Sequence, residues 1–191
     1  MRLSLSVAPA EEPVTLTEAK VHLRVGEDVG EEDALIAGHI TAARVEAERI
    51  LGRSLVSQSW EGKMDSFPDD DALTLPMAPL RSVTSIKYVD TDGVEQTVSS
   101  ADYTVDTSGV VGRVYLNYGK SWPGIRSEYN AVRVVFVAGY GDAGSVPEDV
   151  RSWILLRVAD RYEHRESIVV GTIATKLPEL GGLLMGDRLG F

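Results

Sequence analysis

The sequence predicts an α+β protein with a small helical bundle core, an inserted antiparallel β-rich domain of sandwich or barrel-like type, and an extended C-terminal tail. Helical patterns precede residue 57 and return after residue 144, whereas short β-branched and aromatic runs separated by turn residues lie between them. The last stretch is apolar but rich in glycine. We assign residues 1–56 to the N-terminal part of the helical core, 57–140 to the inserted β domain, 141–166 to the C-terminal helix of the core, and 167–191 to the tail.

The first predicted helix is short. Thr15 and Glu18 have the spacing of a capping box, in which each side chain accepts a hydrogen bond from the other residue's backbone N–H. The helix is expected to run to about Val25 and to be followed by a glycine-containing turn.

A second, longer helix is predicted between the acidic cluster Glu31, Glu32 and Asp33 and the helix-terminating Gly52. The carboxylates suit the positive end of the helix dipole. The apolar positions follow a 4-3-4-3 spacing, which predicts one continuous seam against another helix. The residues of this seam are Ile36, Ile40, Ala43, Ala47 and Ile50.

The middle of the chain has the pattern of an antiparallel sheet. Val83, Ile86 and Tyr88 belong to a β-branched and aromatic run that ends at the hairpin turn Asp90-Thr91-Asp92-Gly93. Turn residues recur at short intervals, which favours a sandwich or barrel over a parallel sheet. Strands are predicted near 58–64, 72–76, 82–90, 94–98, 103–106, 112–118 and 131–138.

The third helix is predicted from about Pro147 to Arg165, with Ser145 and Glu148 at capping-box spacing. Its apolar residues cover more than one stripe, so the helix needs two packing partners. One partner is the second helix, and the other is either a neighbouring subunit or the interior of the same chain. The candidate subunit-contact or core residues are Val150, Trp153, Ile154, Val158 and Tyr162.

Composition excludes several classes of function. Cysteine is absent, which rules out disulfides, thiolate zinc sites and a cysteine nucleophile. The net charge of -10 disfavours tight binding to a phosphate backbone. There is no apolar run long enough to span a membrane, and the N-terminal apolar stretch is too short for a signal peptide, so synthesis in the cytoplasm is expected.

No motif in the sequence predicts catalysis, a cofactor or a metal. The GxGxxG run from Gly139 to Gly144 follows a strand-like segment, but the next helix begins beyond the third glycine and too little chain remains for a nucleotide-binding sheet. A permissive turn is the preferred interpretation. His22, His39 and His164 have no second histidine or cysteine at metal-ligand spacing. We therefore expect a protein that is not an enzyme.

A basic stripe is predicted on the third helix, where Arg157, Arg161 and Arg165 recur every four residues. Acidic residues lie alongside in the sequence. Pairing within the helix is therefore the preferred interpretation over binding of an acidic partner or a phosphate. The acidic residues concerned are Asp160, Glu163 and Glu166.

The order of several segments resembles the head-tail connector, or adaptor, proteins of long-tailed phages, prophages and gene transfer agents. The segments are individually weak patterns, but their order and spacing are specific and cover most of the chain. They are VTLTEAKVHLRV, EEDALIAGHITAARVEAERILGRSLVSQSW, LTLPMAPLRSVTSIKYVDTDG, YTVD, the pair Trp122-Pro123, VRVVFVAGYG and VPEDVRSWILLRVADRYEHRES.

This resemblance implies a structural virion protein in the neck of a phage-like particle. Such adaptors form a homo-oligomeric ring, with twelve copies expected, between the portal and the tail, and the ring carries the DNA channel. The implied partners are the portal protein, another neck or tail-completion (stopper) protein, and DNA that passes without specific binding. An acidic channel lining would suit that passage, and the candidates are Glu27, Asp28, Glu31 and Glu32.

The C-terminal segment of such adaptors reaches the portal. Here that role falls to residues 167–191, which lack an obvious fold of their own; packing back on the same chain is the alternative. The candidate portal-docking anchors are Leu177, Leu180, Leu183, Leu184, Met185, Leu189 and Phe191.

Two other functions remain open from the sequence. The β-rich middle could be a virion receptor- or carbohydrate-binding module if its aromatic residues share one exposed face, although core packing explains them more simply. The other function that remains open is a small nucleotide-dependent enzyme built on the glycine motif. The aromatic residues concerned are Trp60, Tyr115, Tyr118 and Trp122.

Overall fold

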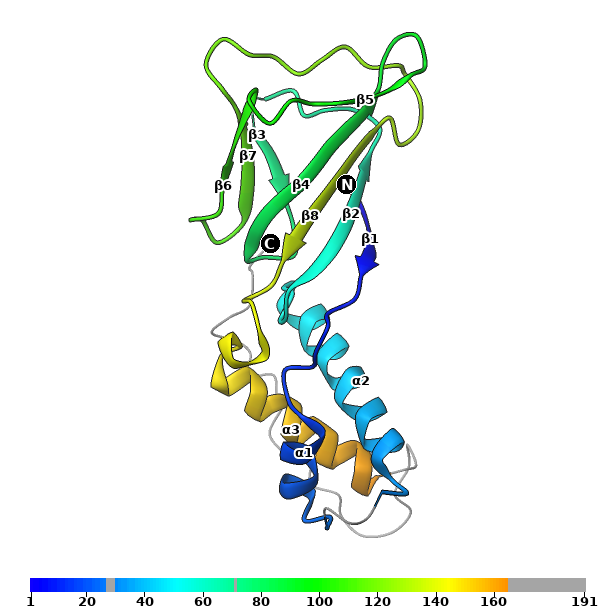
Figure 1. Ribbon diagram of the computed structural model, residues 1–191, viewed down its shortest axis with the longest axis vertical. Coiled ribbons are helices and arrows are strands. Elements are labelled where there is room, and N and C mark those ends of the chain that lie inside the picture. Colours follow the sequence, from blue (N-terminus) through cyan, green and yellow to red (C-terminus); the bar gives the residue numbers. More distant parts are fainter. Residues whose placement is uncertain (27–29, 71, 165–191) are drawn as a thin grey trace, which may run out of the picture. The chain divides into compact units, whose positions relative to one another are not determined.

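The computed structural model describes residues 1–26, 30–70 and 72–164 (Figure 1). The described residues form three α-helices and eight strands, and every strand pairing is antiparallel. This confirms the predicted α+β class. The chain divides into two compact units. The sheet unit comprises residues 1–10 and 57–140, and the helical unit comprises residues 11–56 and the described residues from 141 onward.

The sheet unit contains a five-stranded and a three-stranded sheet (Figure 1). In spatial order, the first consists of β1 (Arg2–Val7), β2 (Gln58–Met64), β8 (Val132–Ala138), β4 (Leu80–Val89) and β5 (Glu95–Thr97). The second consists of β3 (Ala72–Leu75), β7 (Gly112–Leu116) and β6 (Tyr103–Asp106).

Strand β8 is the centre of the larger sheet, because β2 and β4 both pair with it along their lengths. Its alternate residues Val132, Val134, Phe136 and Ala138 are fully buried, as a strand with one core-facing side requires. Their side chains share one apolar core with residues of the smaller sheet, among them Leu73, Leu75 and Val114.

The predicted hairpin between β4 and β5 is present. The Asp90 carboxylate accepts hydrogen bonds from the backbone N–H groups of Asp92 (3.0 Å) and Val94 (2.9 Å), and Gly93 has a φ of 85°. The Asp90 oxygens therefore bind the turn's own backbone.

Strand β1 was not predicted, and the assignment of the first ten residues to the helical core was wrong. Residues 2–7 pair with β2 at the edge of the five-stranded sheet. The alternation Leu3-Ser4-Leu5-Ser6-Val7 is a strand signal of period two. Leu5 and Val7 remain exposed, so this edge strand adds little to the apolar core.

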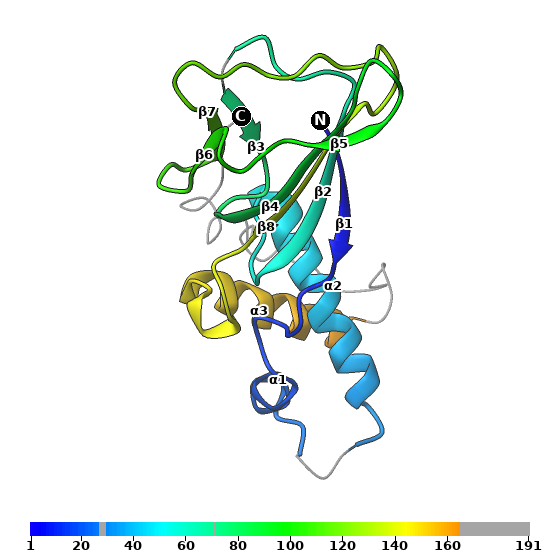
Figure 2. The same cartoon turned by 45° about the horizontal axis from the view of Figure 1, so that its top comes forward.

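The helical unit contains α1 (Leu16–Leu23), α2 (Asp33–Leu51) and α3 (Glu148–Glu163), and each pair of these helices is in contact (Figure 2). The capping box of α1 is confirmed: Glu18 N–H donates to Thr15 Oγ1 at 3.1 Å, and Thr15 N–H donates to Glu18 Oε2 at 2.7 Å. Helix α2 ends at Gly52, whose φ of 68° is left-handed, as predicted.

The predicted seam of α2 is correct for Ile36, Ile40, Ala43 and Ala47, which are all buried. Its last member is wrong, because Leu51 is buried and Ile50 is exposed. The alternating 4-3 spacing assumes 3.5 residues per turn, whereas an α-helix has 3.6, so the predicted seam rotates slowly around the helix axis. By the last turn the buried position is therefore the fourth residue after Ala47, and not the third.

The predicted capping box of α3 is also wrong. Asp142 Oδ1 accepts hydrogen bonds from the N–H (2.9 Å) and Oγ (2.7 Å) of Ser145, which places Ser145 in a short 3₁₀ turn, η1 (Ala143–Ser145). Helix α3 then begins after Pro147, without a side-chain cap. The helix therefore starts beyond Gly144, so the glycine run is a turn and lacks the geometry of a dinucleotide site.

We predict that Gly112→Ala destabilises the sheet unit by about 1–3 kcal/mol, because a Cβ atom there would lie 2.3 Å from Leu80 Cβ, which cannot rotate away. Gly124→Ala is the matched control, since no atom in the described part of the chain would lie within 4 Å of its Cβ. Urea unfolding followed by circular dichroism measures both variants. Equal unfolding free energies would contradict the close approach of β7 to β4.

Candidate assembly surfaces

Helices α2 and α3 are joined by ion pairs centred on Glu46. Arg157 donates to both carboxylate oxygens of Glu46 at 3.0 Å, and Arg161 donates to Glu46 Oε2 at 2.9 Å. Arg157 also pairs with Asp160, one turn along its own helix. The predicted pairing within α3 is therefore present for Arg157 and Asp160, but the principal partner of the basic stripe is Glu46 on α2. Arg165 lies outside the described residues.

Arg44 forms a buried ionic network that the sequence analysis missed. Its guanidinium donates to Glu12 Oε2 at 2.7 Å and to Glu48 Oε2 at 2.9 Å, and Glu48 Oε1 accepts a hydrogen bond from Leu55 N–H at 3.0 Å. Arg44 and Glu48 are buried. The spacing of four residues between Arg44 and Glu48 indicates an ion pair within one helix, but exposed ion pairs have the same spacing, so the sequence does not show that this pair is buried.

Helix α1 is held by two further cations. The buried Lys20 pairs with Asp33, the first residue of α2, at 2.8 Å. Arg151 on α3 donates to the Pro13 carbonyl at 3.0 Å and to Glu18. Each helix is therefore bonded to the other two by charged side chains, which gives the helical unit a defined geometry.

The residues predicted as a subunit contact or a core helix mostly face inward in their own unit. Val150, Trp153, Ile154 and Val158 are buried, and α3 contacts both α1 and α2. The two packing partners of α3 are therefore available within one chain. Tyr162 is half-buried, and its hydroxyl donates to Glu32.

The acidic residues predicted to line a channel are in different environments. Glu31 is exposed, whereas Glu32 is half-buried and accepts the hydrogen bond from Tyr162. Glu27 and Asp28 lie outside the described residues. All seven predicted portal-docking anchors, from Leu177 to Phe191, also lie outside them.

The aromatic residues of the sheet unit are divided between core and surface. Trp122 stacks on Phe67 with ring centroids 4.6 Å apart, and Trp60 packs against the core. Tyr115 is half-buried and Tyr118 is fully exposed. Core packing thus accounts for both tryptophans, which weakens the binding-module interpretation.

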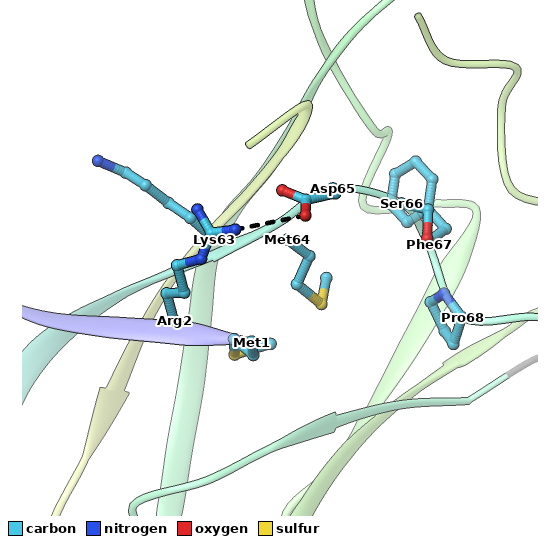
Figure 3. A pocket seen from close by; sticks show the side chains of 8 residues that line it. All are labelled: Met1, Arg2, Lys63, Met64, Asp65, Ser66, Phe67 and Pro68. Carbon is cyan, nitrogen blue, oxygen red and sulfur yellow. Dashed lines mark hydrogen bonds and ion pairs between the residues drawn. The ribbon is translucent and has the colours of Figure 1, made fainter. Parts of the chain in front are cut away.

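A surface hollow of about 430 Å³ lies where β1 and β2 meet (Figure 3). The Arg2 guanidinium pairs with Asp65 at 3.4 Å on its rim, and methionine side chains lie beside them. Among the described residues, no cluster of histidine and carboxylate side chains could hold a metal ion. The hollow is lined by Met1, Arg2, Lys63, Met64, Asp65, Ser66, Phe67 and Pro68.

Residues 13–111 match the family model of the phage gp6-like head-tail connector proteins. The chain belongs to this family. Membership confirms the predicted connector family and shows a structural, non-enzymatic protein of the virion. No curated protein sequence matches the connector. Among the described residues, none of its helices combines the length and apolarity needed to cross a membrane.

Solved structures of gene transfer agent particles contain similar chains. A chain in the neck of an empty particle, computed with C6 symmetry, is 27% identical, with a TM-score of 0.83. A chain in the virion of a native particle is 26% identical, with a TM-score of 0.81. A chain in a native neck computed with C12 symmetry has the same fold at 24% identity and a TM-score of 0.80. Each comparison covers 100% of the connector and 97% of the other chain.

We predict that Glu46→Gln lowers the unfolding free energy of the connector by about 1 kcal/mol at neutral pH and makes it less sensitive to acid. Burial raises the pKa of Glu46, but hydrogen bonds from Arg157 and Arg161 outweigh this and hold that pKa below its usual value. The stabilisation is therefore present above the unfolded-state pKa of ~4.3 and is lost as the pH falls through the lower folded-state value.

Urea titrations between pH 7 and pH 3 measure this effect. Glu31→Gln, an identical change at an exposed position, is the control and should retain the acid sensitivity of the wild type. A constant difference between wild type and Glu46→Gln at all these pH values would contradict the prediction.

Proposed function

We propose that the connector forms a closed ring of twelve copies in the neck, between the portal and the tail, and that DNA passes through its centre. The observation that carries this proposal is the likeness, along the whole chain, to a chain in the neck of a gene transfer agent particle. A neck with six-fold symmetry is compatible with twelve copies. Closed symmetry turns a weak contact between neighbours into a stable assembly, because every subunit makes the contact twice.

Charge supports the passage of DNA without adhesion. The chain has a net charge of -10, and phosphate groups are repelled by an acidic surface. Basic residues on α3, which would attract phosphate, are instead occupied by Glu46. We propose that Glu27, Asp28, Glu31 and Glu32 face the channel, with Glu31 as the exposed member among the described residues.

Residues 167–191 are the proposed portal-docking segment. Their leucine, methionine and phenylalanine side chains suit a groove on a protein surface, and twelve such segments around one ring would act together to raise the avidity for the portal. A second neck or tail-completion (stopper) protein is the proposed partner on the tail side.

We predict that a chain ending at Glu166 loses co-purification with the portal protein, because its apolar anchors are removed. In the full chain, Leu183→Ser with Leu184→Ser should weaken the same interaction. Val110→Ser is the matched control, since Val110 is an exposed apolar residue of the sheet unit. Equal recovery of the portal protein with the truncated and the full chain would contradict the docking role.

A further inference from the structure

Helix α2 carries an uncharged face that points away from the core of the helical unit. Between Asp33 and Arg44 the helix has no charged residue, although half of the residues between them are exposed. The outward positions recur at a 3-4-3-4 spacing and end in a cation, which makes one straight stripe along the helix. They are Leu35, Gly38, Ala42, Val45 and Arg49.

This face is open to another molecule. Leu35 is 42% and Val45 38% exposed, and a Cβ atom on Gly38 would meet no atom of the described residues within 4 Å. Small residues at Gly38 and Ala42 allow a second helix to approach the backbone closely.

Helix α3 has a matching outward face, opposite the side that carries Val150 and Ile154. Its positions recur at a 4-3-4 spacing and also end in a charge, which here is negative. Leu156 is 41% exposed and is the bulky residue of the stripe. The members are Ser152, Leu156, Ala159 and Glu163.

The terminal charges of the two faces differ from the arginines that hold the helical unit together. Arg44, Arg151, Arg157 and Arg161 all have carboxylate partners within the chain. By contrast, neither Arg49 on α2 nor Glu163 on α3 has a hydrogen bond or ion pair with any residue in the described part of the chain. The two faces therefore present opposite, unpaired charges.

We propose that neighbouring copies in the ring meet through these faces, with α2 of one copy parallel to α3 of the next. One register aligns the last four positions of the α2 stripe with the four of α3: Arg49 pairs with Glu163, Val45 lies against Ala159, Ala42 against Leu156, and Gly38 against Ser152. In this register Leu35 falls level with Asp149, an exposed residue in the first turn of α3. At each apolar level a larger side chain meets a smaller one, as interdigitating helices require.

The two faces are different surfaces of one chain, so their contact is heterologous. A heterologous contact is the kind that generates rings, because each copy offers one face to each neighbour. This inference rests on the proposed ring and names the residues that would close it. The residues buried inside α3, such as Val150 and Trp153, do not take part.

Disulfide trapping tests the contact without background, because the chain contains no cysteine. The double variant Ala42→Cys/Leu156→Cys is oxidised with the portal protein present, analysed on a non-reducing gel, and viewed by electron microscopy. We expect a ladder of covalent multimers from the double variant, monomers from each single variant, and dimers only from a mixture of the two singles. Val21→Cys/Leu156→Cys is the matched control, because Val21 is exposed on α1, and it should give no ladder.

The outcomes separate this inference from the proposed function. Rings without a ladder would overturn the α2–α3 contact and leave the ring standing. The absence of both rings and ladder would overturn the ring as well. An equal ladder from the control pair would also overturn the contact, because the trapping would then be non-specific.

Charge reversal provides a second test that does not depend on trapping. Arg49→Glu and Glu163→Arg should each weaken self-association by roughly tenfold or more, because like charges would then face each other across the interface. The double variant should restore it. Glu163→Arg should keep the melting temperature of the wild type, and Arg49→Glu should lower it only slightly, because it places an anion in the last turn of α2. Failure of the double variant to restore association would contradict the register.

Discussion

The buried guanidinium of Arg44 is the interaction on which the helical unit depends. A charge removed from water requires partners, and loss of one member of such a network typically costs ~3–5 kcal/mol. Glu12 precedes α1, Glu48 belongs to α2, and the N–H of Leu55 lies in the segment that leaves α2. The Arg44–Glu48 pair thus ties three separate parts of the chain together.

The same requirement for charge satisfaction separates the inner from the outer surfaces of the helices. On the inward sides, Glu46 forms ion pairs with two arginines of α3, and ion pairs of Lys20 and Arg151 connect α1 to the other two helices. The outward stripe of α2 carries no charge from Leu35 to Val45, and the outward positions of α3 from Ser152 to Ala159 carry none. In an acidic chain, an uncharged exposed stripe is costly for solubility, and covering it with a neighbouring copy would remove that cost.

Much of the fold was predictable because its signals are local. The strands from β2 to β8, the hairpin at Asp90 and the capping box at Thr15 all follow from short patterns of side-chain spacing and turn chemistry. One error occurred where two local signals competed: Ser145 donates hydrogen bonds to Asp142 and therefore does not cap α3. The other was the edge strand β1, whose period-two alternation is present in the sequence but was not recognised.

The sequence by itself determined the α+β class, the absence of cysteine chemistry, and, through the order of its segments, the connector family. Only the tertiary structure decided which side of each helix is inward, because a wide apolar arc such as that of α3 does not say which residues meet a partner. It also decided that Arg157 and Arg161 belong to Glu46, since an ion pair between residues more than a hundred positions apart depends on how α2 and α3 pack.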